Sequence, residues 1–274
     1  NNTNNAITTA TSWSGGVAPA STSAGSTDAY IFGSGSTTYQ SPDLSSSRTA
    51  LSVVFNSGAN AYTLGSASAK VLGISNGGVT NNATAVQTFS LAMALTSGNS
   101  TWQSVAGGAL SITGTLDLST SASSRTLTIA GAGNFTASNV IANGGTATAG
   151  VVTVTSTGVT VLSGNNTYDG LTTMNATGGV LTLSGDNSGA AGGVTLTAGT
   201  LNLNSATALG SGTVTMAASQ FFNNTSGSAI TNTGNNNITL GDALTFGTSG
   251  SNASNNLNLG TGTVTASGSR TLTL

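Results

Sequence analysis

The sequence predicts an all-β protein, and three observations support this prediction. Thr, Ser, Gly and Asn account for 157 of the 274 residues, whereas Glu, His and Cys are absent. Short apolar runs alternate with Thr, and the same pattern returns at a fixed interval along the chain. Helical domains depend on Glu, Lys, Leu and Ala, and no capped segment here places apolar residues at helical spacing. We therefore expect little or no helix.

Alternation of apolar residues with Thr marks the expected strands. Successive side chains of a strand point to opposite faces, so this pattern buries one face and exposes the other. Thr suits the outward positions because its branched Cβ favours extended backbone. Clusters of Gly, Asn and Ser, which are typical of tight turns, separate the runs. In chain order, we expect strands at 151–155, 181–183, 194–197, 201–203, 214–216 and 272–274.

Two apolar tracks repeat in step with each other. The members of the first track each precede Ser or Asn, and they are Leu162, Leu183 and Leu203. The second track keeps nearly the same interval and consists of Met174, Leu196 and Met216. Both tracks define a unit of about 20 residues, which cannot bury its own apolar face and must therefore stack on its neighbours.

Among repeat architectures of this period, a parallel β-helix fits best. The chain lacks the motifs of leucine-rich repeats and of calcium-binding nonapeptide repeats, and Gly does not recur at every third position as in collagen. In a parallel β-helix, strands of successive coils pair about 4.8 Å apart, so Asn, Thr and Val stack on their own kind. A charge repeated in every coil would stack on like charge. The sequence therefore predicts a right-handed parallel β-helix with coils of about 20 residues.

The N-terminal part of the chain differs from the rest. The first hundred residues contain Pro19 and Pro42, the only prolines, and most of the aromatic residues. A solenoid needs an atypical end that covers its first coil. We therefore interpret residues 1–70 as a capping or entry region and residues 71–274 as β-helix repeats. Some ten coils would form a rod about 50 Å long.

The composition excludes several kinds of site. Without Cys or His, the chain has no disulfide, no thiolate metal site, no His-ligated metal and no His general base. A net charge of −2 from ten charged side chains offers no basic surface for nucleic acid. The chain contains no run of 18 apolar residues, which is about the length needed to span a membrane. We expect no cofactor, no metal and no enzymatic activity.

Acid–base chemistry would depend on six aspartates, because general acid–base catalysis without His needs two placed carboxylates. Asp169 and Asp186 are separated by a little less than one repeat, so adjacent coils could bring them together as a carboxylate pair. Turn residues are the favoured interpretation, because Asp is common in loops rich in Asn and Gly. The four basic residues lie apart from any Asp cluster. The aspartates are Asp28, Asp43, Asp117, Asp169, Asp186 and Asp242.

Aromatic residues and sequons add little evidence for carbohydrate. Trp13 and Trp102 could stack on a sugar, but burial in the cap or beneath a loop is the favoured interpretation. Asn-x-Ser/Thr sequons, for example at Asn99, Asn165 and Asn252, occur about as often as this composition predicts by chance, so they indicate nothing about glycosylation.

The segment from Val161 to Met216 reads VLSGNNTYDGLTTMNATGGVLTLSGDNSGAAGGVTLTAGTLNLNSATALGSGTVTM. It resembles the autotransporter-associated β-strand repeat, whose pattern runs LSGxNTYxGxTTxxxGxLxL followed by ALGSGxVT. The resemblance implies large exported or surface-anchored bacterial proteins with a parallel β-helix and no enzymatic activity, and no catalytic residues carry over. Weaker similarity to the start of such proteins lies at 12–19, 28–32, 54–55 and 62–64.

These observations predict a structural protein, a rigid rod or matrix fibre outside the bacterial cell or on its surface. Because the chain begins with Asn1 and shows no signal peptide, we expect a mature or processed segment. Only 4% of the residues are charged, which protects the surface poorly against self-association. Open β-helix ends would stack head to tail into a filament. We expect Ile7, Leu272 and Leu274 at this assembly surface.

Two other function classes remain open at this point. The chain could be an adhesin, an autotransporter passenger that binds a host or glycan surface. More remotely, it could be a β-helix enzyme acting on polysaccharide. The expected partners are therefore further copies of the chain and a cell-surface or matrix polysaccharide.

Overall fold

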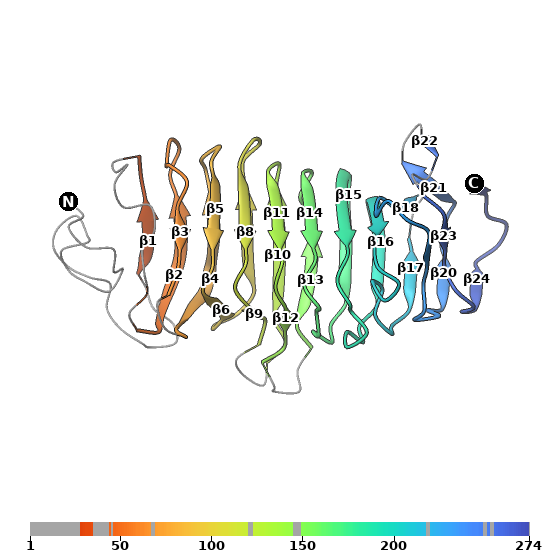
Figure 1. Ribbon diagram of the computed structural model, residues 1–274, viewed down its shortest axis with the longest axis horizontal. Helices are drawn as coiled ribbons and strands as arrows, with labels where there is room; N and C mark the ends of the chain where they lie inside the picture. The colour runs from red at the N-terminus through yellow and green to blue at the C-terminus, as the bar shows by residue number, and fades with distance from the viewer. Residues whose placement is uncertain are drawn as a thin grey trace.

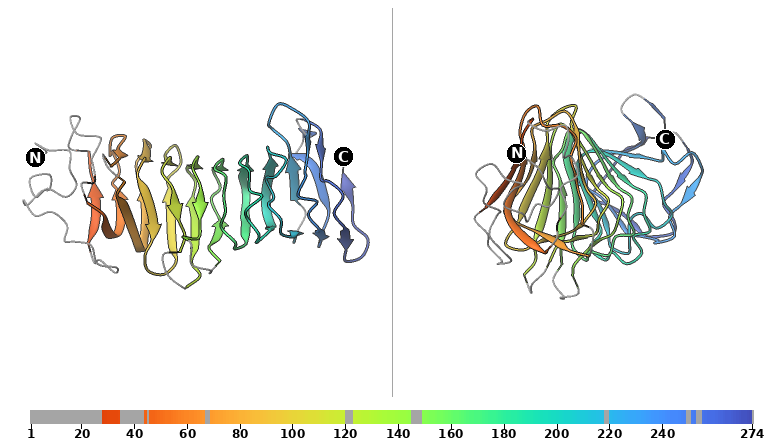
Figure 2. Two further views of the ribbon diagram at one scale, coloured as in Figure 1. Left: turned by 60° about the horizontal axis from the view of Figure 1, so that its bottom comes forward. Right: turned by 60° about the vertical axis from the view of Figure 1, so that its left-hand side comes forward.

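The computed structural model confirms an all-β parallel β-helix. It describes residues 28–34, 44, 46–66, 69–119, 123–144, 149–217, 220–248, 251–252 and 255–273. These residues form 25 strands and no helix, so none of them supplies a helical span for a membrane. The strands stack as successive coils along one axis (Figures 1 and 2).

Ladder 1 joins eleven strands in parallel along the whole solenoid. The second apolar track lies here, since Met174 pairs with Leu196 and Leu196 with Met216. At about 4.8 Å per strand, the ladder extends over roughly 48 Å, as the sequence predicts. Its strands are β1 (Ala29–Phe32), β2 (Arg48–Phe55), β4 (Val71–Asn81), β7 (Ser100–Ser104), β10 (Thr126–Gly131), β13 (Val151–Val154), β15 (Thr172–Leu183), β16 (Val194–Leu203), β17 (Val214–Met216), β20 (Ile238–Leu240) and β24 (Val264–Ala266).

Ladder 2 forms the next side of each coil and carries the first apolar track. Leu162 pairs with Leu183, and Leu183 with Leu203, as the repeat predicts. The long strands β15 and β16 turn from ladder 1 into ladder 2 within one element. The other strands are β3 (Thr63–Leu64), β5 (Val86–Phe89), β8 (Ala109–Ile112), β11 (Asn134–Ala137), β14 (Val159–Leu162), β18 (Gln220–Asn223), β21 (Leu244–Thr248) and β25 (Leu272–Thr273).

The third side of the solenoid changes along its length. The first parts of β2 and β4 begin ladder 3, which continues through β6 (Ala92–Leu95), β9 (Leu116–Asp117) and β12 (Ile141–Ala142). Loops replace the third strand in the central coils. Near the C-terminal end, β19 (Ile230–Thr231) pairs with β23 (Leu257–Asn258), and β22 (Ser251–Asn252) pairs antiparallel with β21.

The number of residues per coil is smaller where the third strand is missing. Measured between equivalent positions of ladder 1, each of the three coils between Val154 and Met216 contains about 20 residues. Coils on either side are longer, for example about 25 residues from Ile129 to Val154. The short repeat seen in the sequence therefore belongs to the central coils, where a loop takes the place of the third strand.

Aromatic side chains fill the interior of the N-terminal coils. Phe32 stacks on Phe55 with ring centroids 5.0 Å apart, and Phe55 meets Phe89 edge to face at 6.0 Å. Trp102 continues the column, 6.3 Å from both Phe89 and Phe135. Offset and edge-to-face contacts of this kind add about 0.5–1.5 kcal/mol per pair to the energy of apolar burial.

The parallel coils already include part of the expected capping region. Strands β1 and β2 pair in ladder 1, and β3 joins ladder 2, so the regular architecture reaches back to Ala29. Residues 1–27, 35–43, 45 and 67–68 of that region lie outside the described residues.

A corner that follows ladder 2 requires glycine. In the repeated Leu-Ser-Gly segments, Gly185 lies against the carbonyl of Gly164, and Gly164 lies against the carbonyl of Asn139. A Cβ at either position would overlap with the backbone of the neighbouring coil. Successive coils pass too close for any side chain at this corner.

We expect Gly185→Ala to lower the free energy of unfolding by about 1–3 kcal/mol, because backbone must move to admit the methyl group. The control is Gly33→Ala, since a Cβ on Gly33 meets no heavy atom within 4 Å. That change should stay within about 0.5 kcal/mol. Urea unfolding followed by circular dichroism measures both, and equal effects would contradict the explanation.

Candidate functional site

Buried asparagines close the third side of the central coils. Asn166 and Asn187 are 1% and 5% exposed. The Asn187 Oδ1 accepts hydrogen bonds from the backbone N–H and the side-chain amide of Asn166, at 3.1 and 3.0 Å. The Asn187 amide donates to the Ala208 carbonyl at 2.8 Å, and the Ile141 N–H donates to the Asn166 Oδ1 at 2.9 Å. These side chains continue the coil-to-coil bonding from the point where ladder 3 ends.

We expect Asn187→Ala to lower the free energy of unfolding by about 2–4 kcal/mol, because it leaves buried donors and an acceptor without partners. The matched control is Asn165→Ala, an exposed neighbour whose Oδ1 accepts one bond, from the Asp186 N–H at 3.0 Å. Its loss should cost less than about 1 kcal/mol. Chemical denaturation of both variants tests the difference, and similar losses would refute the role of the buried ladder.

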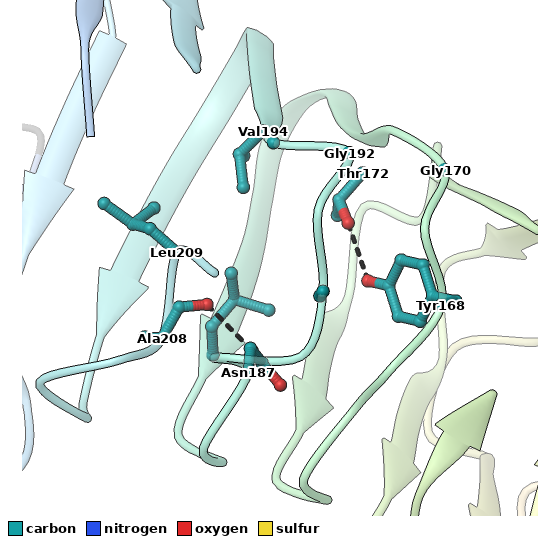
Figure 3. A pocket seen from close by; sticks show the side chains of 11 residues that line it. Tyr168, Gly170, Thr172, Asn187, Gly192, Val194, Ala208 and Leu209 are labelled. Carbon is teal, nitrogen blue, oxygen red and sulfur yellow. Dashed lines mark hydrogen bonds between the residues drawn. The ribbon is translucent and has the colours of Figure 1, made fainter. Parts of the chain in front are cut away.

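A small cavity lies beside these asparagines, between the loops of adjacent coils (Figure 3). Its volume is about 10 Å³, the size of one water molecule. The Tyr168 hydroxyl and the Thr172 Oγ1 are hydrogen-bonded at 2.6 Å in its wall. Burial raises the pKa of the Tyr168 phenol to about 12, so this group stays neutral. The cavity is too small for a substrate.

The structure does not bring Asp169 and Asp186 together as a carboxylate pair. Asp186 is aligned with Asn165 on the preceding coil, and its Oδ1 accepts from the Ser188 N–H at 3.0 Å. The Asp169 Oδ2 accepts from the Asn143 amide at 2.9 Å. The two carboxylates thus serve separate turns. Asp43 lies outside the described residues, and the described part of the chain holds no group of three Asp, Glu, His or Cys suited to a metal ion.

Two aspartates have shifted pKa values in opposite directions. Burial raises the pKa of Asp117 at the end of β9, although its Oδ1 accepts a 2.9 Å bond from the Ser119 N–H. Asp186 is exposed, and hydrogen bonds from the Ser188 N–H and the hydroxyls of Thr207 and Ser188 lower its pKa. The buried Arg125 guanidinium donates to the Leu95 carbonyl.

These shifts predict opposite pH effects. A raised pKa means that the stability from Asp117 is full below the ordinary aspartate pKa of 3.8 and is lost as pH rises through the folded pKa. Asp117→Asn should therefore be more stable than the parent near pH 7 and similar to it near pH 3. Asp186 contributes above 3.8 and loses that contribution as pH falls through the folded pKa. Asp186→Asn should thus be the less stable protein near pH 7. Urea titrations across this range give both differences, and differences of the same sign would contradict the prediction.

The aromatic candidate for sugar binding lies in the core. Trp102 is fully buried, and its Nε1 donates to the Ser100 Oγ at 3.0 Å. The expected burial of this residue is therefore confirmed, but it lies on β7 inside the stack of coils and not in the cap or beneath a loop, and its ring offers no platform for a ligand. Trp13 lies outside the described residues.

A column of threonines covers the outer side of ladder 1. One Thr lies at the same register position on each of eight successive strands. In the central coils, the residues directly before and after this Thr point inward. The alternating pattern predicts outward Thr but not the full column, although each member in the central coils directly precedes a residue of the apolar track. The column consists of Thr101, Thr128, Thr153, Thr173, Thr195, Thr215, Thr239 and Thr265.

The C-terminal coil exposes apolar side chains. Val264 on β24 is 59% exposed and Leu272 on β25 is 54% exposed. Both strands pair on one side only within the described part of the chain. Leu272 is thus accessible, as an assembly residue would need to be, whereas Ile7 and Leu274 lie outside the described residues.

Comparisons of the chain with protein-family models, curated proteins and solved structures gave no match. The similarity to autotransporter-associated repeats therefore stays a prediction from the sequence.

Proposed function

We propose that the protein is a structural rod of the bacterial cell surface or extracellular matrix. The observation that carries this proposal is ladder 1, an unbroken run of parallel backbone pairing through eleven strands. Such pairing resists bending, since each coil inside the stack is hydrogen-bonded to both of its neighbours. A rod of this kind can present or space other surface components without any catalytic group.

The surface chemistry supports a role outside the cell. Four basic residues are present in the whole chain, and Arg125 is buried, so trypsin-like proteases find few cleavage sites. The similarity of 161–216 to autotransporter-associated repeats supports the same location. Antibody labelling of intact cells of the producing organism, compared with lysed cells, tests it. Labelling only after lysis would refute the proposed location.

We further propose that copies stack head to tail. Among the described residues, β24 and β25 each leave one edge without a strand partner, beside the exposed side chains of Val264 and Leu272. A first coil from a second copy would continue both ladders in the same parallel register. Since this contact joins two different surfaces, repetition gives a filament.

We expect Leu272→Lys to shorten or abolish filaments, because stacking would bury a charge at the joint. Val86→Lys is the control, since Val86 is 48% exposed on the side of the rod. Electron microscopy and sedimentation of the purified proteins measure the assembly. Monomeric rods from the parent protein, or equal effects of both variants, would refute head-to-tail stacking while leaving the rod itself intact.

An adhesin is the second candidate function, and one feature favours it. Near the C-terminal end, β22 pairs antiparallel with the last residues of β21, and β22 lies beyond the outline of the coils (Figures 1 and 2). Projecting loops on a rigid scaffold are common binding elements. A specific, competable hit on a glycan array would favour this function over the rod alone.

A further inference from the structure

The outer side of ladder 1 is a regular array of identical groups. We call it the threonine face, and define it as the eight column threonines, from Thr101 to Thr265, with the outward residues beside them. Neighbouring members are one coil apart, about 4.8 Å. Each presents a hydroxyl and a methyl group, and the branched Cβ restricts its χ1 rotation. Because the strands beneath pair in parallel and in register, the array repeats once per coil from β7 to β24.

The hydroxyls of this array are unused within the protein. None of the eight column threonines donates or accepts a side-chain hydrogen bond in the described part of the chain. Thr155, two residues beyond the column, differs because its Oγ1 donates to the Ile129 carbonyl at 3.3 Å. The column hydroxyls are therefore free to bond to an external partner with the same repeat.

The threonine face carries no charge. Outward positions on both sides of the column, from Gln103 to Ser267, contain no Asp, Lys or Arg. The outward Val151 and Leu171 add apolar surface beside the column. Charged groups would hold strongly oriented liquid water, whereas methyl groups and spaced hydroxyls tolerate water in a lattice arrangement.

Two other occupants fit this face less well. Sugar chains are usually held by exposed aromatic rings, but Trp102, the aromatic residue on these eight strands, is buried beneath the face. A second copy of the chain would need about 800 Å² of buried surface per partner. Eight strands and five residues of width give a plane of roughly 34 Å by 13 Å, or about 450 Å².

We propose that the threonine face binds the surface of ice. The spacing of the column is close to the repeat of the water lattice on the prism face of hexagonal ice. The hydroxyls can take lattice positions of water molecules, while the methyl groups fill the hollows between them. Binding through many equivalent weak contacts requires a rigid array, which the ladder provides. This proposal does not depend on the rod function.

The experiment measures how purified protein partitions between a slowly growing ice hemisphere and the remaining liquid. The parent protein should enter the ice. Thr195→Lys, at the centre of the column, should be excluded like a non-binding globular protein, because a lysine both protrudes and holds liquid water. Thr136→Lys is the matched control, a half-buried outward Thr on β11 in ladder 2, and should partition like the parent.

Circular dichroism tests whether each variant is folded. If the Thr195→Lys variant does not fold, Thr239→Lys takes its place, because Thr239 is a more exposed member of the column. Exclusion of the parent from ice would overturn the proposal, as would equal losses in the column and control variants. So would a dimer that dissociates in Thr195→Lys, which would assign the face to a second copy. Retention on crystalline cellulose or chitin that is lost in Thr195→Lys would assign it to polysaccharide.

Discussion

Parallel pairing in register is the interaction on which the rest of the structure depends. When a coil pairs with the next one residue for residue, every position stacks on its own equivalent. Met174, Leu196 and Met216 therefore form one buried column, and Thr173, Thr195 and Thr215 form one half-buried, outward column beside it. A side chain is tolerated at a position only if it can stack on the equivalent side chains of the neighbouring coils. This requirement limits which residue types occur in each column.

The same constraint explains why one corner of the coil requires glycine and why asparagine side chains form hydrogen bonds between the central coils. Gly164 and Gly185 occupy a corner where carbonyls of adjacent coils leave no room for a Cβ. Shortening the coil to about 20 residues removes the third strand and its ladder, and isolated backbone bonds such as Thr167 N–H to the Ile141 carbonyl at 2.9 Å remain there. Asn166 and Asn187 add side-chain hydrogen bonds between the coils on that side, and their burial makes each of these bonds costly to lose.

The sequence was sufficient to predict those features that repeat at a constant interval. The partners of Leu183 and Leu196 follow directly from spacing, because the central coils have nearly equal lengths. Asp169 and Asp186 show the limit: a separation close to one repeat places them on successive coils, but at different positions around the coil. The full threonine column was also missed, since outside 154–216 the coils are longer and unequal, and spacing alone no longer gives the register.

Charged residues are disfavoured on both the inner and the outer side of the coils. Inside, an ionised group repeated every 4.8 Å or so would face both desolvation and its own kind. Outside, the same repetition would line the rod with like charges and weaken the pairing between coils. Uncharged Thr on the outer side of ladder 1 avoids this repulsion. The hydroxyl and methyl groups of these threonines also form the regular surface from which we infer ice binding. The same Thr residues therefore stabilise the pairing between coils and provide the recognition surface.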